Sequence, residues 1–371
     1  MLEAICFLII ELFLFELGCL TRNSRAQCFV ILFFSWVFVA FTMISADIDN
    51  YRYAYNANIY LGKDPLFFKL QQIGLKAGLK FDVYKAILGS IMMLIMTYVI
   101  INYSKETSIL AALCLFLPCG SFATQIRSGL AGVLVILGIQ ILTKGGRWRL
   151  TKYLLLIFIA SGIHQMAVIY LILSIPYIVK NKLSWIRIMR IVVLVGIICI
   201  HVAPFMVYKI IENIGTINNT YIRTIAYRLS QMFSSEFRAT TIGFLFNMLH
   251  HMILFYCTEK SQVVALKIRG NEEAICKEIM LERAINYTLL LIIPLYAISF
   301  HFSRILYYAM PFMYASAINA VDLSRDEQGH VYGKNRIYLM ISVTLFVSLW
   351  GILQEPQDYA RIISGLFRIG I

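Results

Sequence analysis

The residues best suited to chemistry in this 371-residue chain are carboxylates, arginines and one histidine beside long apolar segments. Ionisable groups placed so close to a membrane are costly, and they usually line a cavity or pair with one another. A carboxylate or a neutral imidazole can accept a proton there, and an arginine can hold a phosphate oxygen in its planar fork. These candidates are Asp47, Asp49, Arg127, His164 and Arg304.

The surroundings of these residues allow a functional and a structural interpretation. Asp47 and Asp49 open a tyrosine-rich segment that includes Tyr51 and Tyr55. Its flat apolar rings can stack on sugars, or they can form an aromatic belt at the membrane interface. His164 follows small residues that permit close helix packing, and it can be a base or a structural residue in a turn. The arginines can bind an anion, or simply extend toward the membrane surface.

The composition requires a membrane protein to position these residues. Hydrophobic residues make up 60% of the chain and charged residues only 14%, with a mean hydropathy of +0.75. The apolar blocks lack two-residue alternation, so helices are expected rather than a barrel. We predict a single integral-membrane domain (1–371) with about twelve transmembrane helices. The predicted spans are 4–20, 28–46, 84–102, 109–124, 128–143, 153–163, 165–179, 188–207, 240–257, 284–300, 304–320 and 337–353.

Two short basic loops set the predicted orientation. One holds residues 144–152 and the other residues 180–190, and short loops rich in lysine and arginine stay in the cytoplasm. The apolar stretch between them is too long for one span, so it must turn near His164. All five ionisable candidates then face the outer side of a bacterial inner (cytoplasmic) membrane.

Three connecting segments are predicted to be long. Segment 47–83 is an outer, periplasmic loop with an interfacial helix after Pro65, and 208–239 is a second outer loop that carries Arg223 and Arg228. Segment 258–283 is a cytoplasmic loop of mixed charge. Within the first span, Glu11 is expected to pair with an arginine of another span.

Several functions lack support in the sequence. No Walker loop, dinucleotide fingerprint, zinc-protease motif or nucleophile elbow occurs. The eight cysteines are scattered, and no pair has metal-ligand spacing. We therefore expect no metal, no cofactor and no nucleic-acid partner.

Several short motifs, in this order along the chain, resemble the EpsG-like family of polysaccharide repeat-unit polymerases, often called Wzy-type. The similarity extends from about residue 40 to about residue 315. One motif, Asp64-Pro65-Leu66-Phe67, departs from the Glu-Pro-Gly-Phe form expected in the family. The matching motifs are Asp47 with Tyr51, the patch 64–67, Gln125–Ala131, Ala160–His164, and Ser303-Arg304 with Tyr308 and Pro311.

The resemblance implies a membrane glycosyltransferase similar to the GT-C class. It would move a glycan from undecaprenyl pyrophosphate onto a second lipid-linked repeat unit, with inversion and without a metal. The surface glycan would be an O-antigen, a capsule or an exopolysaccharide, and a chain-length regulator protein is a possible partner. The alternatives are a membrane O-acyltransferase and a lipid-linked oligosaccharide flippase or ligase.

The same resemblance distributes roles among the candidate residues. Asp47 is preferred over His164 as the catalytic base, with Asp49 beside it. The expected pyrophosphate contacts are Arg127, Arg304, Arg223 and Arg228. The expected glycan contacts are Tyr51, Tyr55, Gln125 and Tyr308.

Overall fold

The computed structural model describes residues 2–59, 64–202, 241–296, 302–325 and 328–366, together with the single residues 209, 213, 216 and 223. Most of the second predicted outer loop, 208–239, lies outside these residues. Helices dominate the described part of the chain, and its only β-type pairing is an isolated bridge between Arg325 and Val331. The predicted all-α class is confirmed.

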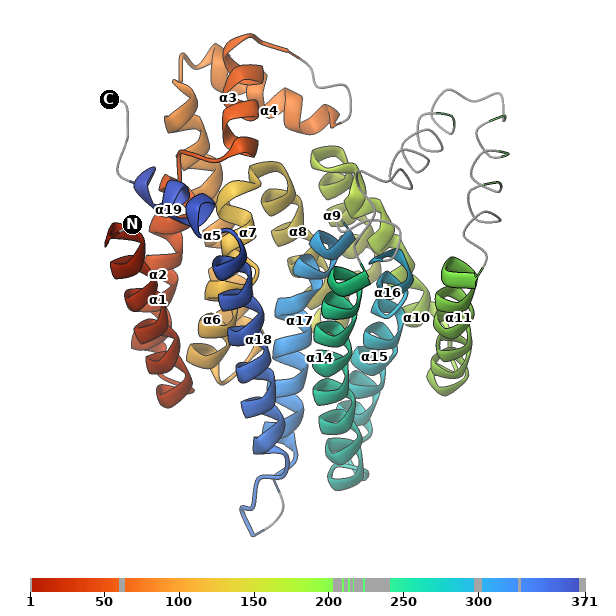
Figure 1. The fold of residues 1–371 in the computed structure, drawn as a ribbon. Coiled ribbons are helices and arrows are strands. Elements are labelled where there is room, and N and C mark those ends of the chain that lie inside the picture. Colours follow the sequence, from red (N-terminus) through yellow and green to blue (C-terminus); the bar gives the residue numbers. More distant parts are fainter. Residues whose placement is uncertain are drawn as a thin grey trace.

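The helices form an elongated bundle, with two short helices and the C-terminal helix gathered at one end (Figure 1). The predicted segment 258–283 consists of the end of α14, a short turn and the beginning of α15. In chain order, the helices are α1 (Leu2–Thr21), α2 (Arg25–Phe41), α3 (Ala46–Asn56), α4 (Pro65–Lys76), α5 (Phe81–Tyr103), α6 (Thr107–Phe116), α7 (Cys119–Thr124), α8 (Ile126–Lys144), α9 (Arg149–Ile163), η1 (Gln165–Leu173), α10 (Ser174–Ile178), α11 (Lys182–Val202), α14 (Thr241–Ile268), α15 (Glu273–Leu289), α16 (Ile292–Tyr296), α17 (Ser303–Leu323), α18 (Lys334–Gln354) and α19 (Pro356–Ser364).

Several of these helices are long and apolar enough to cross a membrane. Among the described residues there are five: α1, α5, α8, α18 and the continuous segment Glu273–Tyr296. A sixth results if α2 and α3, which meet at a bend of 55°, count as one span. The chain is therefore a multi-pass helical membrane protein. Other predicted spans are short or broken: 109–124 divides into α6 and α7 at Pro118, and 165–179 consists of η1 and α10.

The chain turns at His164, as the sequence predicted. α9 ends just before this residue and η1 begins just after it. The two segments lie side by side. The Tyr153 hydroxyl of α9 donates to the Tyr170 carbonyl of η1. Farther from the turn, Arg149 Nε donates to the Tyr177 hydroxyl at 3.1 Å. This hairpin places His164 at its tip.

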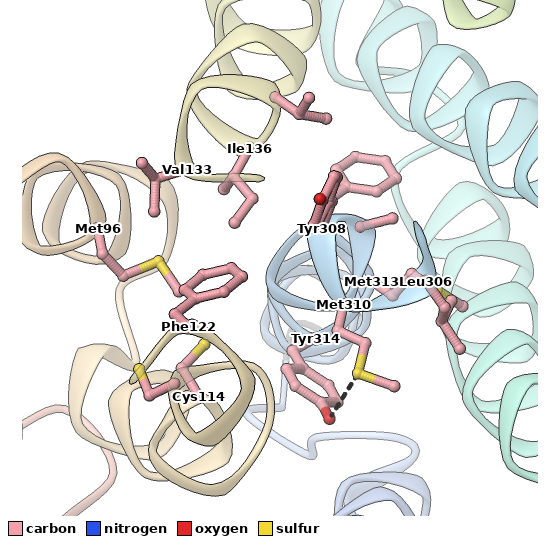
Figure 2. Close-up of a cluster of buried hydrophobic side chains, with 14 of the residues drawn as sticks. Met96, Cys114, Phe122, Val133, Ile136, Leu306, Tyr308, Met310, Met313 and Tyr314 are labelled. Carbon is pink, nitrogen blue, oxygen red and sulfur yellow. Dashed lines mark hydrogen bonds between the residues drawn. The ribbon is translucent and has the colours of Figure 1, made fainter. Parts of the chain in front are cut away.

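The interior of the bundle is tightly packed between α5, α7, α8 and α17, and the side chains there are apolar or aromatic (Figure 2). Gly132 lets two rings approach α8, because a Cβ at this position would lie 2.9 Å from the Tyr308 ring and 3.1 Å from the Phe122 ring. Small residues at helix contacts allow such packing in membranes. The core therefore fixes α17 against the start of α8.

The bundle has two distinct ends. The site end is the one where α3, α4 and α19 lie (Figure 1). At the opposite end, α5, α8 and α17 finish together: Lys144 Nζ donates to the Tyr103 carbonyl at 2.9 Å, and Asn319 Nδ2 donates to the same oxygen at 2.8 Å. The segment of residues 144–152 therefore lies at the opposite end.

The prediction that Glu11 pairs with an arginine is wrong. Its carboxylate accepts a hydrogen bond from the Tyr359 hydroxyl at 2.8 Å. α19 packs against α1 and brings this tyrosine to Glu11. Directly after α19, Gly365 lies close to Ile44, which follows α2; a Cβ on Gly365 would lie 2.7 Å from the Ile44 side chain. Burial raises the pKa of Tyr359, and the adjacent Glu11 raises it further, so the phenol keeps the proton that it donates.

Candidate functional site

A buried aspartate joins three segments at the site end. Asp64 precedes Pro65, which starts α4 with a backbone conformation already suited to a helix. The Asp64 carboxylate does not cap this helix. One oxygen lies 2.5 Å from Arg127 Nη1, and the other accepts the Gln165 backbone N–H at 2.9 Å. Because Asp64 is only 5% exposed, it ties α4 to the starts of α8 and η1.

Arg127 is held by this aspartate and by an aromatic face. It is the second residue of α8, and its guanidinium carbon lies 5.6 Å from the centre of the Tyr51 ring. Arg127 Nε is buried and makes no hydrogen bond within the described part of the chain. A guanidinium has several N–H donors in a fixed fork, so the Asp64 contact leaves donors for an anion.

His164 lies beside the same aspartate. Its backbone N–H donates to the Ala160 carbonyl at 2.8 Å, and the next residue, Gln165, binds Asp64. Gly162 lets α4 pack against the end of α9, since a Cβ there would lie 2.5 Å from Leu66. The Asp64 contact and the Gly162 contact therefore place the histidine turn next to the start of α4.

Asp47 shares a helix face with the aromatic partner of Arg127. The Ser45 hydroxyl caps α3 by accepting the Ile48 N–H at 3.1 Å, and Asp47 lies in the first turn, where a negative charge is favourable. Residues four positions apart are neighbours on a helix, so Asp47 lies one turn before Tyr51 on the same face. Asp47 is half-buried and forms no ion pair with any described residue.

Asp49, in contrast, belongs to a network of ion pairs. It lies 2.9 Å from Arg52 and 3.3 Å from Arg361 of α19. Arg52 also lies 3.2 Å from Asp82 and donates to the Met43 carbonyl at 2.7 Å. These contacts fasten α3 to α5, to α19 and to the end of α2.

The comparison with known families identifies the group to which this arrangement belongs. The family model of EpsG matches residues 25–355, which is most of the chain and includes every motif described above. The chain belongs to the EpsG family. This is a family of Wzy-like polysaccharide polymerases, and the resemblance seen in the motifs is confirmed. No curated protein and no solved structure matches the chain.

Two predicted glycan contacts of this EpsG-family protein have packing roles in the structure. The Tyr55 ring stacks on Tyr84 with centroids 4.8 Å apart, and its hydroxyl donates to the Leu79 carbonyl at 2.9 Å. Tyr308 is buried and stacks on Tyr170 with centroids 6.0 Å apart. Gln125 is half-buried between α7 and α8. Their assignment to glycan binding remains a prediction.

The structure says less about the other predicted arginines of the EpsG-family chain. Arg304 is the second residue of α17, at the site end, but its side chain is outside the described part of the structure. Arg223 is exposed, but its neighbours in the chain lie outside the described residues, as does Arg228. Pyrophosphate binding by these three arginines remains a prediction.

Sequence reasoning gave Asp64 no role, because its patch departs from the expected family form. A signal was nevertheless present: an acidic residue directly before proline at the start of a helix. The Arg127 contact could not be inferred from this signal, because the two residues are 63 positions apart and belong to different elements.

Proposed function

We propose that this chain polymerises lipid-linked oligosaccharide repeat units by inverting glycosyl transfer at the outer face of the bacterial inner membrane. The observation that carries the proposal is the way Arg127 is held at the site end. Arg127 is fixed by Asp64 and Tyr51, retains a buried N–H donor, and lies beside the His164 turn. Membership of the EpsG family supports polysaccharide polymerisation as the reaction.

The orientation follows from charge. The basic segment of residues 144–152 lies at the end opposite Arg127, and short basic loops remain in the cytoplasm. The site end therefore faces outward. We further propose about twelve membrane crossings in a GT-C-like arrangement, in which the short segments α9 and η1–α10 cross as a pair around His164.

The leaving group would be a lipid pyrophosphate, with undecaprenyl as the lipid. As the glycosidic bond breaks, negative charge grows on the phosphate oxygen, and a preorganised cation lowers the energy of that state. Asp64 fixes the orientation of Arg127 before substrate arrives, so little reorganisation is needed. Because the aspartate also neutralises part of the arginine charge, further cations are required, and Arg304 at the start of α17 is the first candidate.

The acceptor hydroxyl completes the reaction by one displacement. Its oxygen forms a bond to the anomeric carbon of the donor glycan, and the bond from that carbon to the pyrophosphate oxygen breaks. The electron pair leaves with the lipid pyrophosphate, and the hydroxyl proton passes to a protein base. A single displacement inverts the anomeric configuration.

Asp47 is the best-placed base among the candidates. Asp49 is engaged by two arginines and Asp64 is engaged by Arg127, whereas Asp47 forms no ion pair with any described residue. Asp47 also shares a helix face with Tyr51, the buried ring over which the Arg127 guanidinium lies. His164 is the alternative base, because it lies next to the residue that binds Asp64.

Analysis of surface glycan from a deletion strain tests this function. Loss of a polymerase leaves anchors that carry a single repeat unit, and the gel ladder collapses to one band. Complementation with the wild-type chain restores the ladder. Complete loss of surface glycan would instead indicate a flippase or a ligase, and an unchanged ladder with altered acylation would indicate an O-acyltransferase.

A further inference from the structure

A break in the helical backbone separates α2 from α3, the helix that carries Asp47. α2 ends at Phe41 and α3 begins at Ala46, and the two helices meet at a bend of 55°. The residues around the break are buried, and Ala40 and Thr42 are both 0% exposed. Backbone groups that a helix no longer pairs need other partners at membrane depth, because no water is available there. The side chains that bind these groups therefore influence the direction in which α3 leaves α2.

A buried lysine of α5 binds the carbonyls on the α2 side of the break. Lys85 Nζ donates to the Val39 carbonyl at 2.6 Å and to the Ala40 carbonyl at 3.3 Å. Lys85 is 0% exposed, so its ammonium group binds the backbone and does not reach solvent. A cation is favourable there, because the carbonyls at the C-terminal end of a helix carry negative potential. One turn later on α5, Gly89 lets the two backbones approach, since a Cβ there would lie 2.6 Å from the Ala40 Cα.

The α3 side of the break is held from the same helix. Arg52 of α3 donates to the Met43 carbonyl at 2.7 Å and lies 3.2 Å from Asp82 of α5. Asp82 lies one turn before Lys85, so α5 contacts both sides of the break. The Arg52 side chain is partly exposed, and water weakens its contacts, whereas Lys85 is fully buried. Lys85 is therefore the main restraint on the break.

We propose that Lys85 is a positioning residue, which sets the direction of α3 and so places Tyr51 against Arg127. The Tyr51 ring centre lies 5.6 Å from the Arg127 guanidinium carbon and 5.9 Å from the centre of the Phe67 ring of α4. Both distances depend on the direction of α3, and so does the place of Asp47 in its first turn. The importance of this placement for catalysis rests on the proposed function, whereas the placement itself does not.

The distance between spin labels on α3 and α4 tests the placement without relying on polymerase activity. The labels are attached to Tyr53→Cys and Ile73→Cys, two exposed positions, in the full-length protein without its native cysteines. Tyr53 lies about 12 Å along α3 from the break at 1.5 Å per residue, so a rotation of roughly 20° moves it by about 4 Å. Lys85→Met keeps an apolar side chain of similar length but removes the N–H donors, and it should shift or broaden the distance by that amount. Lys80→Met, at the exposed start of α5, should leave the distance unchanged.

Polymerisation of lipid-linked repeat units by the same two variants tests the consequence for the reaction. Lys85→Met should lower turnover by about a hundredfold or more, because a misplacement of 1 Å can already cost that much, and Lys80→Met should keep the product ladder. A lysine with a merely structural role would lower the melting temperature but leave the distance and the turnover of the folded protein unchanged. An unchanged distance in folded Lys85→Met, or a shifted distance with normal turnover, would overturn the proposal. Failure of the wild type to form a ladder would instead overturn the proposed function, and the distance would still decide the placement of α3.

Gly89→Ala decides the question if Lys85→Met does not accumulate as a folded protein. The added Cβ would meet the α2 backbone at Ala40 and push α5 away from the break while Lys85 is intact. This variant should shift the same distance and weaken the ladder. Its control is Gly146→Ala, where the added Cβ meets no atom within 4 Å and neither change is expected. A wild-type distance in Gly89→Ala would overturn the proposal.

Discussion

At the scale of single residues, the site depends on how one aspartate is used. Asp64 starts α4 but gives its carboxylate to Arg127 and to the backbone of Gln165. A buried ion pair of this kind contributes little net stability compared with apolar residues, but breaking it leaves an uncompensated charge. Its value here is geometric, because it sets the direction of the arginine fork.

Asp64→Asn should therefore reduce both stability and activity. The variant keeps the size of the side chain but leaves the Arg127 charge without its partner. We expect a loss of about 2 kcal/mol in unfolding free energy, below the range for fully buried pairs because the arginine is partly exposed. Thermal unfolding in detergent measures it. Asp64→Glu should retain part of the activity, and Asp358→Asn, on an exposed turn of α19, should behave as wild type.

The identity of the base is a second prediction at this scale. Asp47→Asn keeps hydrogen bonding but removes basicity, and loss of a general base typically slows turnover by about 10² to 10⁴. Donor binding should survive, because Arg127 is intact. An assay with lipid-linked repeat units compares this variant with Asp49→Asn and His164→Gln. Rapid turnover by Asp47→Asn together with a dead His164→Gln would transfer the role to the histidine.

At the scale of elements, close packing of α4 on the end of α9 delivers Asp64 to Arg127. Gly162 permits this contact, since a Cβ there would meet Leu66 at 2.5 Å. A second contact, of a different kind, is the exposed ion pair between Arg361 of α19 and Asp49 of α3. Both contacts lie at the site end of the bundle.

Gly162→Ala should displace α4 and weaken polymerisation about tenfold, because shifts near 1 Å at an active site are costly. Leu66→Ala should restore part of the activity in the double variant by removing the clash. The control is Gly146→Ala, where the structure has no atom within 4 Å of the added Cβ. Equal activity of Gly162→Ala and Gly146→Ala would show that the packing of α4 is irrelevant to catalysis.

The elements also show what the sequence could predict. The turn at His164 followed from an apolar stretch too long for one span between two basic loops, and the helix after Pro65 followed from its spacing. The Asp64–Arg127 contact was not predictable, because it depends on how α4 docks after the chain has returned through α5 and α6. Glu11 was assigned to an arginine because charge pairing is the usual solution in membranes, but α19 supplies a tyrosine instead.

At the scale of the whole molecule, the two ends of the bundle have different chemistry. The site end gathers Asp47, Asp64, Arg127 and His164. The opposite end holds the basic segment of residues 144–152 and a polar cavity lined by Lys144 and Glu282, among other residues. The alternation of twelve spans between these ends remains a prediction. The proposal from charge is that the site end faces outward and the opposite end faces the cytoplasm.

Cysteine labelling with an impermeant reagent tests this orientation in a variant that lacks the eight native cysteines. Cysteines at Gly145 and Asn181 should be protected in intact cells and should react only after the membrane is opened. A cysteine at Asn58, after α3, should react from outside. Strong external labelling at Gly145 or Asn181 would reverse the proposed orientation and place Arg127 on the cytoplasmic side.

The central claim is that a fixed arginine fork supports transfer of a glycan from a lipid pyrophosphate. The most direct measurement is polymerisation of purified lipid-linked repeat units by the reconstituted wild-type protein, by Arg127→Lys and by Arg147→Lys. Lysine keeps the charge but loses the fork. We predict a ladder of products from the wild type and from Arg147→Lys, whose residue lies in a basic loop at the opposite end, and almost none from folded Arg127→Lys. A ladder from Arg127→Lys equal to that of the wild type would contradict this role for the arginine.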